Sequence, residues 1–167
     1  LTTTMGELRD AQRLDEALGI AYRFLSRRER TVAEVEQRLA EREVDAETIP
    51  AAIAELEQLG YLDDTGYARR FTHDRRKLDG WGDERIERRL RERGIDRHHI
   101  TAALGRDEGE PTAVEAAVEL VRRRFPVPPE TARDRERVIG MLARKGYSSD
   151  EAHTALRSVL GSSARSG

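Results

Sequence analysis

Apolar residues recur along the chain at spacings of three and four residues, and no stretch sustains an apolar–polar alternation with a period of two. This pattern predicts about nine α-helices and no β-sheet. Thr31, with Glu34 three residues later, forms a capping box. Asp64 and Asp96 begin two further helices, and Gly60 follows a helix end. The sequence therefore predicts an all-α protein.

One apolar pattern occurs three times, with internal steps of 4, 5, 5 and 4 residues. The offset between copies is 51 residues from Val35 to Ile86 and 52 residues from Ile86 to Val138. In each copy a basic residue ends one helix, a turn follows, and Asp or Ser begins the next helix. The sequence therefore predicts three tandem three-helix modules that form an elongated, curved right-handed array. The copies are Val35-Leu39-Val44-Ile49-Ile53, Ile86-Leu90-Ile95-Ile100-Leu104 and Val138-Leu142-Tyr147-Ala152-Leu156.

Glycine- and proline-containing segments between the repeats predict the domain boundaries. Within the repeat, Glu43 occupies the turn position that holds Gly94 and Gly146 in the other copies, which leaves the sharpness of the first turn open. The predicted order is a flexible N-terminal extension (1–14), a first module (15–62), a middle module (63–105), a linker (106–111), a third module (112–160) and a flexible tail (161–167).

The composition excludes several classes of protein. Cys is absent from the 167 residues, which excludes a disulfide framework, a thiolate nucleophile and any Cys-based metal site. No stretch approaches the roughly 20 apolar residues that span a bilayer, and no charged start leads into an apolar signal core. We therefore expect a soluble, cytoplasmic protein that makes no membrane contact.

The formal net charge of −2 conceals a strong segregation of charge. Between Glu29 and Asp64, three basic and eleven acidic residues give a local net charge of −8. Between Arg69 and Arg97, eleven basic and seven acidic residues give +4, and eight basic and three acidic residues from residue 122 to residue 147 give +5. The later segments are therefore suited to an acidic or mixed-charge partner.

Residue patterns typical of catalysis are absent: there is no glycine-rich phosphate loop, nucleophile elbow or HExxH sequence. His98 and His99 are adjacent, so on a helix their side chains should point about 100° apart and should not chelate one ion. His73 and His153 each stand alone, which is typical of ordinary helix histidines. We expect no enzyme activity, no cofactor and no metal site.

Two helices joined by a tight turn also match the outline of a helix-turn-helix motif. The helix that follows each turn is acidic or nearly neutral, which disfavours sequence-specific reading of DNA. Trp81 lies between two glycines and has two interpretations, a core anchor of the middle module or a stacking platform for a base or a partner, and the core anchor is favoured.

Several short motifs occur in a fixed order along the chain. The most characteristic is Gly60-Tyr61-Leu62-Asp63-Asp64, followed by Tyr67-Ala68 and Phe71. The others are Ser26-Arg27-Arg28-Glu29-Arg30-Thr31, Gly80-Trp81-Gly82 with Gly94-Ile95, and Lys145-Gly146-Tyr147. Together they resemble the three modules of the RecX family of recombinase regulators. The resemblance extends from Asp15 to Leu160, in the expected order and spacing.

The resemblance implies a monomeric protein that binds the RecA recombinase in its filament on single-stranded DNA. There it would inhibit the recombinase, ATPase and co-protease activities, and so modulate homologous recombination, DNA repair and the SOS response. Two alternatives stay open. One is a nonspecific DNA-binding helical-repeat protein, which the arginine clusters permit, and the other is a helical-repeat adaptor for an unrelated protein.

The candidate site residues are of two kinds. Basic residues of the middle and third modules are predicted to contact acidic recombinase surface, with contact to the DNA backbone left open. The motif residues are predicted to form the scaffold, with Tyr61, Leu62, Tyr67 and Phe71 on an inward-facing stripe. The predicted contact residues are Arg69, Arg70, Arg75, Arg76, Lys77, Arg85, Arg88, Arg89, Arg122, Arg123 and Arg124. The predicted scaffold residues are Gly60, Tyr61, Leu62, Asp63, Asp64, Tyr67, Ala68, Phe71 and Gly94.

Overall fold

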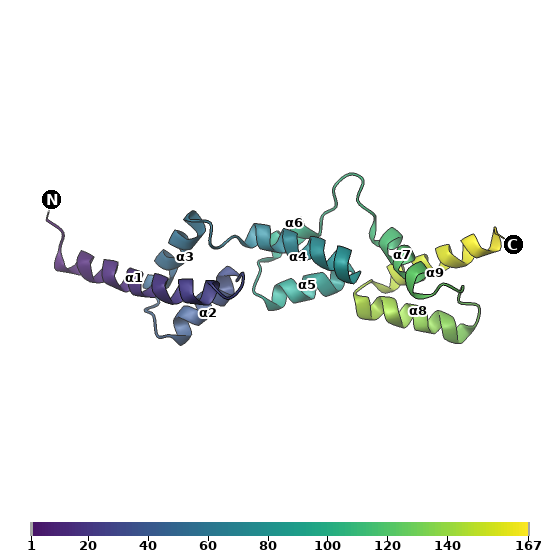
Figure 1. Cartoon of the computed structure of the whole chain (residues 1–167), viewed down its shortest axis with the longest axis horizontal. Helices are drawn as coiled ribbons and strands as arrows, with labels where there is room; N and C mark the ends of the chain where they lie inside the picture. Colours follow the sequence, from purple (N-terminus) through teal and green to yellow (C-terminus); the bar gives the residue numbers. More distant parts are fainter. Residues whose placement is uncertain (1, 167) are drawn as a thin grey trace. The chain divides into compact units, whose positions relative to one another are not determined.

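The computed structural model describes residues 2–166, which form nine α-helices and no strand (Figure 1). The predicted all-α class is confirmed. Within the same residues, no helix is both long enough and apolar enough to cross a membrane. The helices are α1 (Met5–Leu25), α2 (Val32–Glu41), α3 (Thr48–Gln58), α4 (Asp64–Asp79), α5 (Asp83–Glu92), α6 (Arg97–Leu104), α7 (Ala113–Arg124), α8 (Ala132–Lys145) and α9 (Ser149–Ala164).

Side-chain caps define where several helices begin. The predicted capping box at α2 is confirmed: the Thr31 side chain accepts a hydrogen bond from the Glu34 backbone N–H, and the Glu34 carboxylate accepts one from the Thr31 N–H. Boxes of the same kind begin α1 and α9. Because α1 starts at Met5, most of the predicted N-terminal extension is helical, and its flexibility stays a prediction.

The helices follow the three-module order α1–α3, α4–α6 and α7–α9 (Figure 1). In the first module α1 packs on α2 and α3 around a buried core that includes Val35, Leu39 and Leu56. In the third module α9 packs on α7 and α8 around a core that includes Val121 and Leu142. In both modules apolar residues at helical spacing form the inward face, as the repeat pattern predicts.

The chain divides into two compact units. The first runs through Ala68 and takes in Arg91–His99, and the second comprises Arg69–Leu90 and the residues from Ile100 onward. The boundaries fall inside α4, α5 and α6, so the middle module contributes residues to both units. The curved array expected from the sequence concerns the arrangement of the units and stays a prediction.

The fifteen repeated apolar positions occupy the core, as predicted. Val44, Ile49 and Leu104 are half-buried, and the other positions are buried. The five-residue steps in the pattern cross the turn between the second and third helices of each module, where an apolar residue points inward. That residue is Val44, Ile95 or Tyr147.

All three repeat turns adopt the same left-handed backbone conformation. The φ angle is 61° at Glu43, 78° at Gly94 and 100° at Gly146. The first turn is therefore as sharp as the others, although a glutamate occupies it. The glycines are needed for a different reason, because a Cβ at Gly94 would overlap the Ala33 side chain and a Cβ at Gly146 would overlap Arg85.

These close approaches belong to a junction that occurs twice. In the first unit the Thr31 hydroxyl donates a hydrogen bond to the Arg93 carbonyl over 2.7 Å. In the second unit the Gly82 N–H donates to the Lys145 carbonyl over 2.8 Å. Gly82 lies 51 residues after Thr31, and Lys145 lies 52 residues after Arg93. In both junctions the start of a module's second helix is therefore held by the helix end of the following module.

Candidate functional site

The basic residues of the middle module divide into those that hold the fold together and those that are exposed. The strongest internal group surrounds Asp83 at the start of α5. Its carboxylate accepts hydrogen bonds from Arg106 over 2.8 and 3.1 Å, and from Arg76 over 3.0 Å. Arg76 also donates to the Leu104 carbonyl over 2.7 Å. The Asp83 cluster, defined as Asp83, Arg76 and Arg106, therefore joins α4, α5 and the segment after α6.

Arg106 also joins the two ends of the predicted linker (106–111). Its Nε donates to the Pro111 carbonyl over 3.0 Å, while both terminal nitrogens bind Asp83. Arg106 thus joins the start of the linker both to α5 and to the end of the linker. Sequence reasoning missed Asp83 and Arg106, because neither belongs to a motif and 23 residues separate them.

The charged side chains of the Asp83 cluster stabilise one another's ionised forms. Burial by itself would raise the pKa of Asp83, but the hydrogen bonds and charges of Arg106 and Arg76 outweigh it and hold that pKa below its ordinary value. The hydrogen bond to Asp83 in turn raises the pKa of Arg106 above its ordinary value. Both partners therefore favour the ionised pair, and Arg76 serves the fold.

Arg85 and Arg75 are also engaged inside the second unit. The Arg85 guanidinium lies 4.0 Å from the centre of the Trp81 ring and donates to the Arg144 carbonyl over 3.0 Å. Arg75 forms an ion pair with Asp79 and lies 5.8 Å from the Trp81 ring centre. Trp81 is half-buried, and both cations lie near its ring, so it takes part in packing within the second unit without being a fully buried core residue.

Eight of the predicted contact residues are exposed and form what we call the exposed cation set. Arg75, Arg76 and Arg85 are half-buried and take part in the internal contacts described above, so they are left out of it. Within the set, Arg122 donates to the Ser162 hydroxyl over 3.0 Å. All members belong to the second unit. They are Arg69, Arg70, Lys77, Arg88, Arg89, Arg122, Arg123 and Arg124.

Of the four motif residues expected on the inward-facing stripe, Leu62 and Tyr67 are buried, Phe71 is half-buried and Tyr61 is exposed. Leu62, Tyr67 and Ala68 are buried, and the Tyr67 hydroxyl accepts a hydrogen bond from Arg93 over 2.8 Å. The inward orientation expected of Tyr61 is wrong, because 55% of this residue is exposed and its ring lies edge-on against Tyr22. Gly60 in the left-handed region turns the chain so that Leu62 enters the core in its place.

The two acidic residues of the motif organise the start of α4. Asp63 accepts a hydrogen bond from the Gly66 N–H over 3.0 Å and so caps the start of α4. Asp64 accepts one from the Val32 N–H over 3.0 Å and so joins α4 to α2. Burial is the largest influence on Asp64 and raises the pKa of its carboxyl.

Phe71, further along α4, is half-buried and contacts the Trp81 ring.

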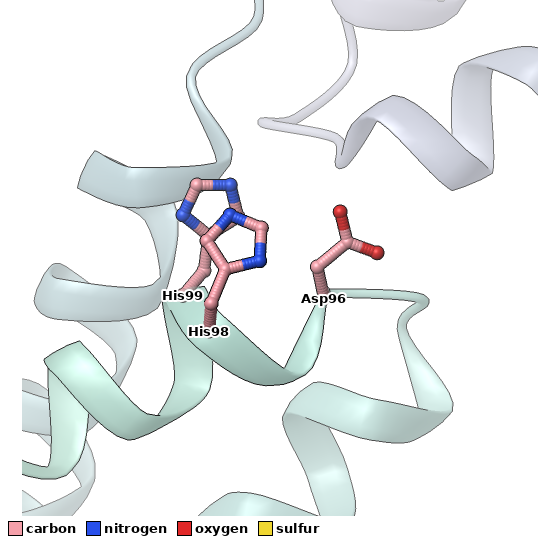
Figure 2. Close-up of side chains that lie close together, drawn as sticks. All are labelled: Asp96, His98 and His99. Atoms are coloured by element: carbon pink, nitrogen blue, oxygen red, sulfur yellow. The ribbon is translucent and has the colours of Figure 1, made fainter.

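One group of side chains has the donor types of a metal site. Asp96, His98 and His99 each offer a ligand atom, and these atoms lie within 4.8 Å of one another at the start of α6 (Figure 2). The expectation that the two histidines point apart is wrong, because their ring centres are 3.9 Å apart. Rotation about the side-chain bonds offsets the 100° between their positions on the helix. The positive end of the α6 dipole disfavours a cation here, so the group carries no assignment.

Tyr147, the inward residue of the third repeat turn, is a buried phenol. Its hydroxyl donates a hydrogen bond to the Gly80 carbonyl over 3.2 Å. Burial, with Asp83 adding to it, raises the pKa of Tyr147 to about 12. The folded protein therefore favours the neutral phenol.

Replacing Tyr147 by Phe should remove a pH dependence of stability. At pH 8 the variant should be about 1 kcal/mol less stable, because it lacks the hydrogen bond. The wild-type protein should lose stability as the pH rises from about 10 to 12, since the unfolded phenol ionises first. Urea unfolding at pH 8 and pH 11 should show the difference vanish or reverse at the higher pH. A difference that stays constant would contradict the prediction, and Tyr61→Phe is the exposed control.

Comparison with known protein families settles the relationship of the chain. Three successive segments match family models: "RecX, first three-helix domain" over residues 17–56, the second domain over 63–104, and the third over 112–156. Together they span well over half of the sequence. The chain belongs to the RecX family. The modules defined by the repeat are therefore the three RecX domains.

Curated relatives with the name "Regulatory protein RecX" support this membership. The protein of Mycolicibacterium vanbaalenii is 34% identical over 156 residues, covering 89% of this chain and 85% of the relative. The protein of Leptothrix cholodnii is 34% identical over 139 residues, covering 83% of this chain and 86% of the relative. The chain is thus a member of a family of regulatory proteins, and the family name describes no enzyme.

Solved structures agree with the fold. A crystal structure of RecX from Lactobacillus salivarius has a TM-score of 0.74 and 24% sequence identity, covering 89% of this chain and 97% of that one. A second, titled "Crystal structure of regulatory protein RecX", has a TM-score of 0.69. The all-helical RecX fold is therefore shared at low sequence identity.

Proposed function

We propose that this RecX-family chain binds the RecA recombinase filament on single-stranded DNA and inhibits its recombinase, ATPase and co-protease activities. The observation that supports this most is the match of all three RecX domains, in order, to residues 17–156. The protein would act in the cytoplasm as a monomer and restrain homologous recombination and the SOS response. It works by binding alone, with no cofactor.

The exposed cation set supports an acidic partner. Its eight members lie on α4, α5 and α7, while Arg75, Arg76 and Arg85 are held by internal contacts. Exposed charges of one sign accelerate docking onto a surface of the opposite sign and make binding weaken as salt rises. Contact with the DNA backbone inside the filament would use the same charges.

ATP hydrolysis by RecA on single-stranded DNA tests the proposal directly. The full chain should inhibit hydrolysis at ratios well below one molecule per RecA monomer, because a filament transmits the effect of one bound regulator to many protomers. Absence of inhibition, together with tight binding to naked DNA, would favour the nonspecific DNA-binding alternative. Absence of both would favour an adaptor for another protein.

Charge reversal tests whether the exposed cation set contacts the filament. We expect the triple variant Arg69→Glu, Lys77→Glu and Arg88→Glu to bind the filament at least about tenfold more weakly at physiological salt. The matched control reverses three exposed arginines of the first unit, Arg9, Arg23 and Arg27. Fluorescence anisotropy with labelled filaments measures both variants. Equal affinity of the triple variant and the wild-type protein would remove this surface from the proposal.

A further inference from the structure

The contact between the middle and third modules depends on an arginine that binds a helix end. Arg85 lies over the Trp81 ring and donates a hydrogen bond to the Arg144 carbonyl at the end of α8. The last carbonyls of a helix lack partners within the helix and carry the negative end of its dipole. An arginine of the middle module, held on an aromatic ring, therefore binds the C-terminus of a helix in the third module.

In the third module an arginine at the same repeat position lies near a different aromatic ring, because Arg133 corresponds to Trp81 and the ring is that of Phe125. Arg137 lies 52 residues after Arg85, the offset of the repeat, and its guanidinium is 5.8 Å from the centre of the Phe125 ring. Arg137 is well exposed, with 67% of its side chain accessible. Within residues 2–166 its ion-pair partner is Asp134, one turn earlier on α8, at 4.0 Å. The guanidinium of Arg137 is therefore held on its own helix and remains accessible to a partner.

A groove of about 450 Å³ lies along α8 at this position. Met141, Gly140 and Phe125 contribute its apolar surface. Arg133, Arg137 and Arg144 contribute three positive charges, and Glu136 is the one acidic residue that lines it. The groove thus combines an apolar surface with an excess of positive charge, which suits an acidic segment with an apolar anchor.

The repeat also shows why a second copy of this chain is a poor occupant. In both junctions the turn that docks has a glycine, because a Cβ at Gly94 or Gly146 would overlap the neighbouring helix. The corresponding turn of the first module has Glu43, which carries a Cβ in the same left-handed conformation. The first turn of a second copy therefore cannot dock in the way that the internal turns do.

We infer that the groove along α8 of the third module binds the C-terminal end of an acidic helix of a recombinase protomer. Arg137 donates to the last carbonyls of that helix, as Arg85 does to Arg144, while Arg133 and Arg144 face its acidic side chains. An apolar residue of the helix packs on Met141. The inference rests on the proposed function and adds a specific docking site to it.

Two variants of the full chain test the groove in different ways. Gly140→Leu fills it without changing the charge, and α8 accommodates the side chain because the nearest atom to a Cβ there is the flexible end of Arg144, at 3.2 Å. Arg137→Glu reverses the charge that binds the helix end. Arg157→Glu on α9 is the matched control, since it makes the same charge change at an exposed residue of the same module.

Binding to RecA filaments on single-stranded DNA, followed by fluorescence anisotropy, should be at least about tenfold weaker for Gly140→Leu and for Arg137→Glu. Arg157→Glu should stay within about twofold of the wild-type protein. Circular dichroism and thermal unfolding of each variant establish that the fold is retained. Loss of affinity in both groove variants, with the control unaffected, supports the inference.

Other results would overturn it. If both groove variants bind the filament like the wild-type protein, the groove is not a docking site, while the proposed function stands. If the wild-type protein does not bind filaments at all, the proposed function fails and the inference fails with it. If the groove variants lose affinity for naked single-stranded DNA alone, the occupant is nucleic acid. If sedimentation shows that Arg137→Glu abolishes a self-association of the wild-type protein, the occupant is a second copy.

Discussion

Replacing Gly146 by Ala should strongly destabilise the second unit. The added Cβ would overlap the Arg85 side chain and lie 2.6 Å from the Arg85 backbone nitrogen, which cannot move without displacing α5. The φ of 100° adds a conformational cost for any residue other than glycine. We expect a loss of about 3–5 kcal/mol in the free energy of unfolding, measured by urea denaturation of the full chain.

Gly60→Ala is the control that separates the cost of the steric overlap from the cost of the left-handed backbone conformation. Gly60 has a φ of 81°, but a Cβ there meets nothing within 4 Å. This variant should lose only about 1 kcal/mol, which is the conformational cost alone. If Gly146→Ala costs no more than Gly60→Ala, the close packing between the third repeat turn and α5 is contradicted.

Removal of the Asp83 carboxylate should have the second-largest effect. Asp83→Ala leaves Arg76 and Arg106 without their shared acceptor, although only 20% and 23% of their side chains are accessible to solvent. We expect a loss of about 2–3 kcal/mol in the free energy of unfolding, below the value for a fully buried pair because water partly screens the charges. Thermal unfolding measures it, and Asp74→Ala, an exposed aspartate on α4, is the control.

The pH dependence of this loss gives an independent check. The pKa of Asp83 is lowered in the folded protein, so its ionised form stabilises the fold at any pH above the unfolded value of about 3.9. That stabilisation disappears as the pH falls through the folded pKa. The difference between wild-type protein and Asp83→Ala should therefore be constant from pH 6 to 8 and shrink below about pH 4. A difference that grows with acid would contradict the assignment.

Local pattern was sufficient to predict the helices, the repeat and most of the core. The 4, 5, 5, 4 spacing places residues such as Val35, Ile86 and Val138 on an inward face, and all three are fully buried. The capping box at Thr31 involves residues three apart in sequence, so it could be predicted for the same reason. Each of these features depends on interactions within one helix or one turn.

Only the tertiary structure decided which charged and turn residues serve the fold. Arg85 and Arg88 look alike in the sequence, yet Arg85 binds a carbonyl 59 residues away and Arg88 is exposed. Sequence also cannot show why Glu43 is accommodated where Gly146 is needed, since the difference is whether a neighbouring helix packs on the turn. The sequence by itself determined the modules, because helix formation and amphipathic burial act over a few residues. Contacts between modules join distant residues, and these determined which arginines remain exposed.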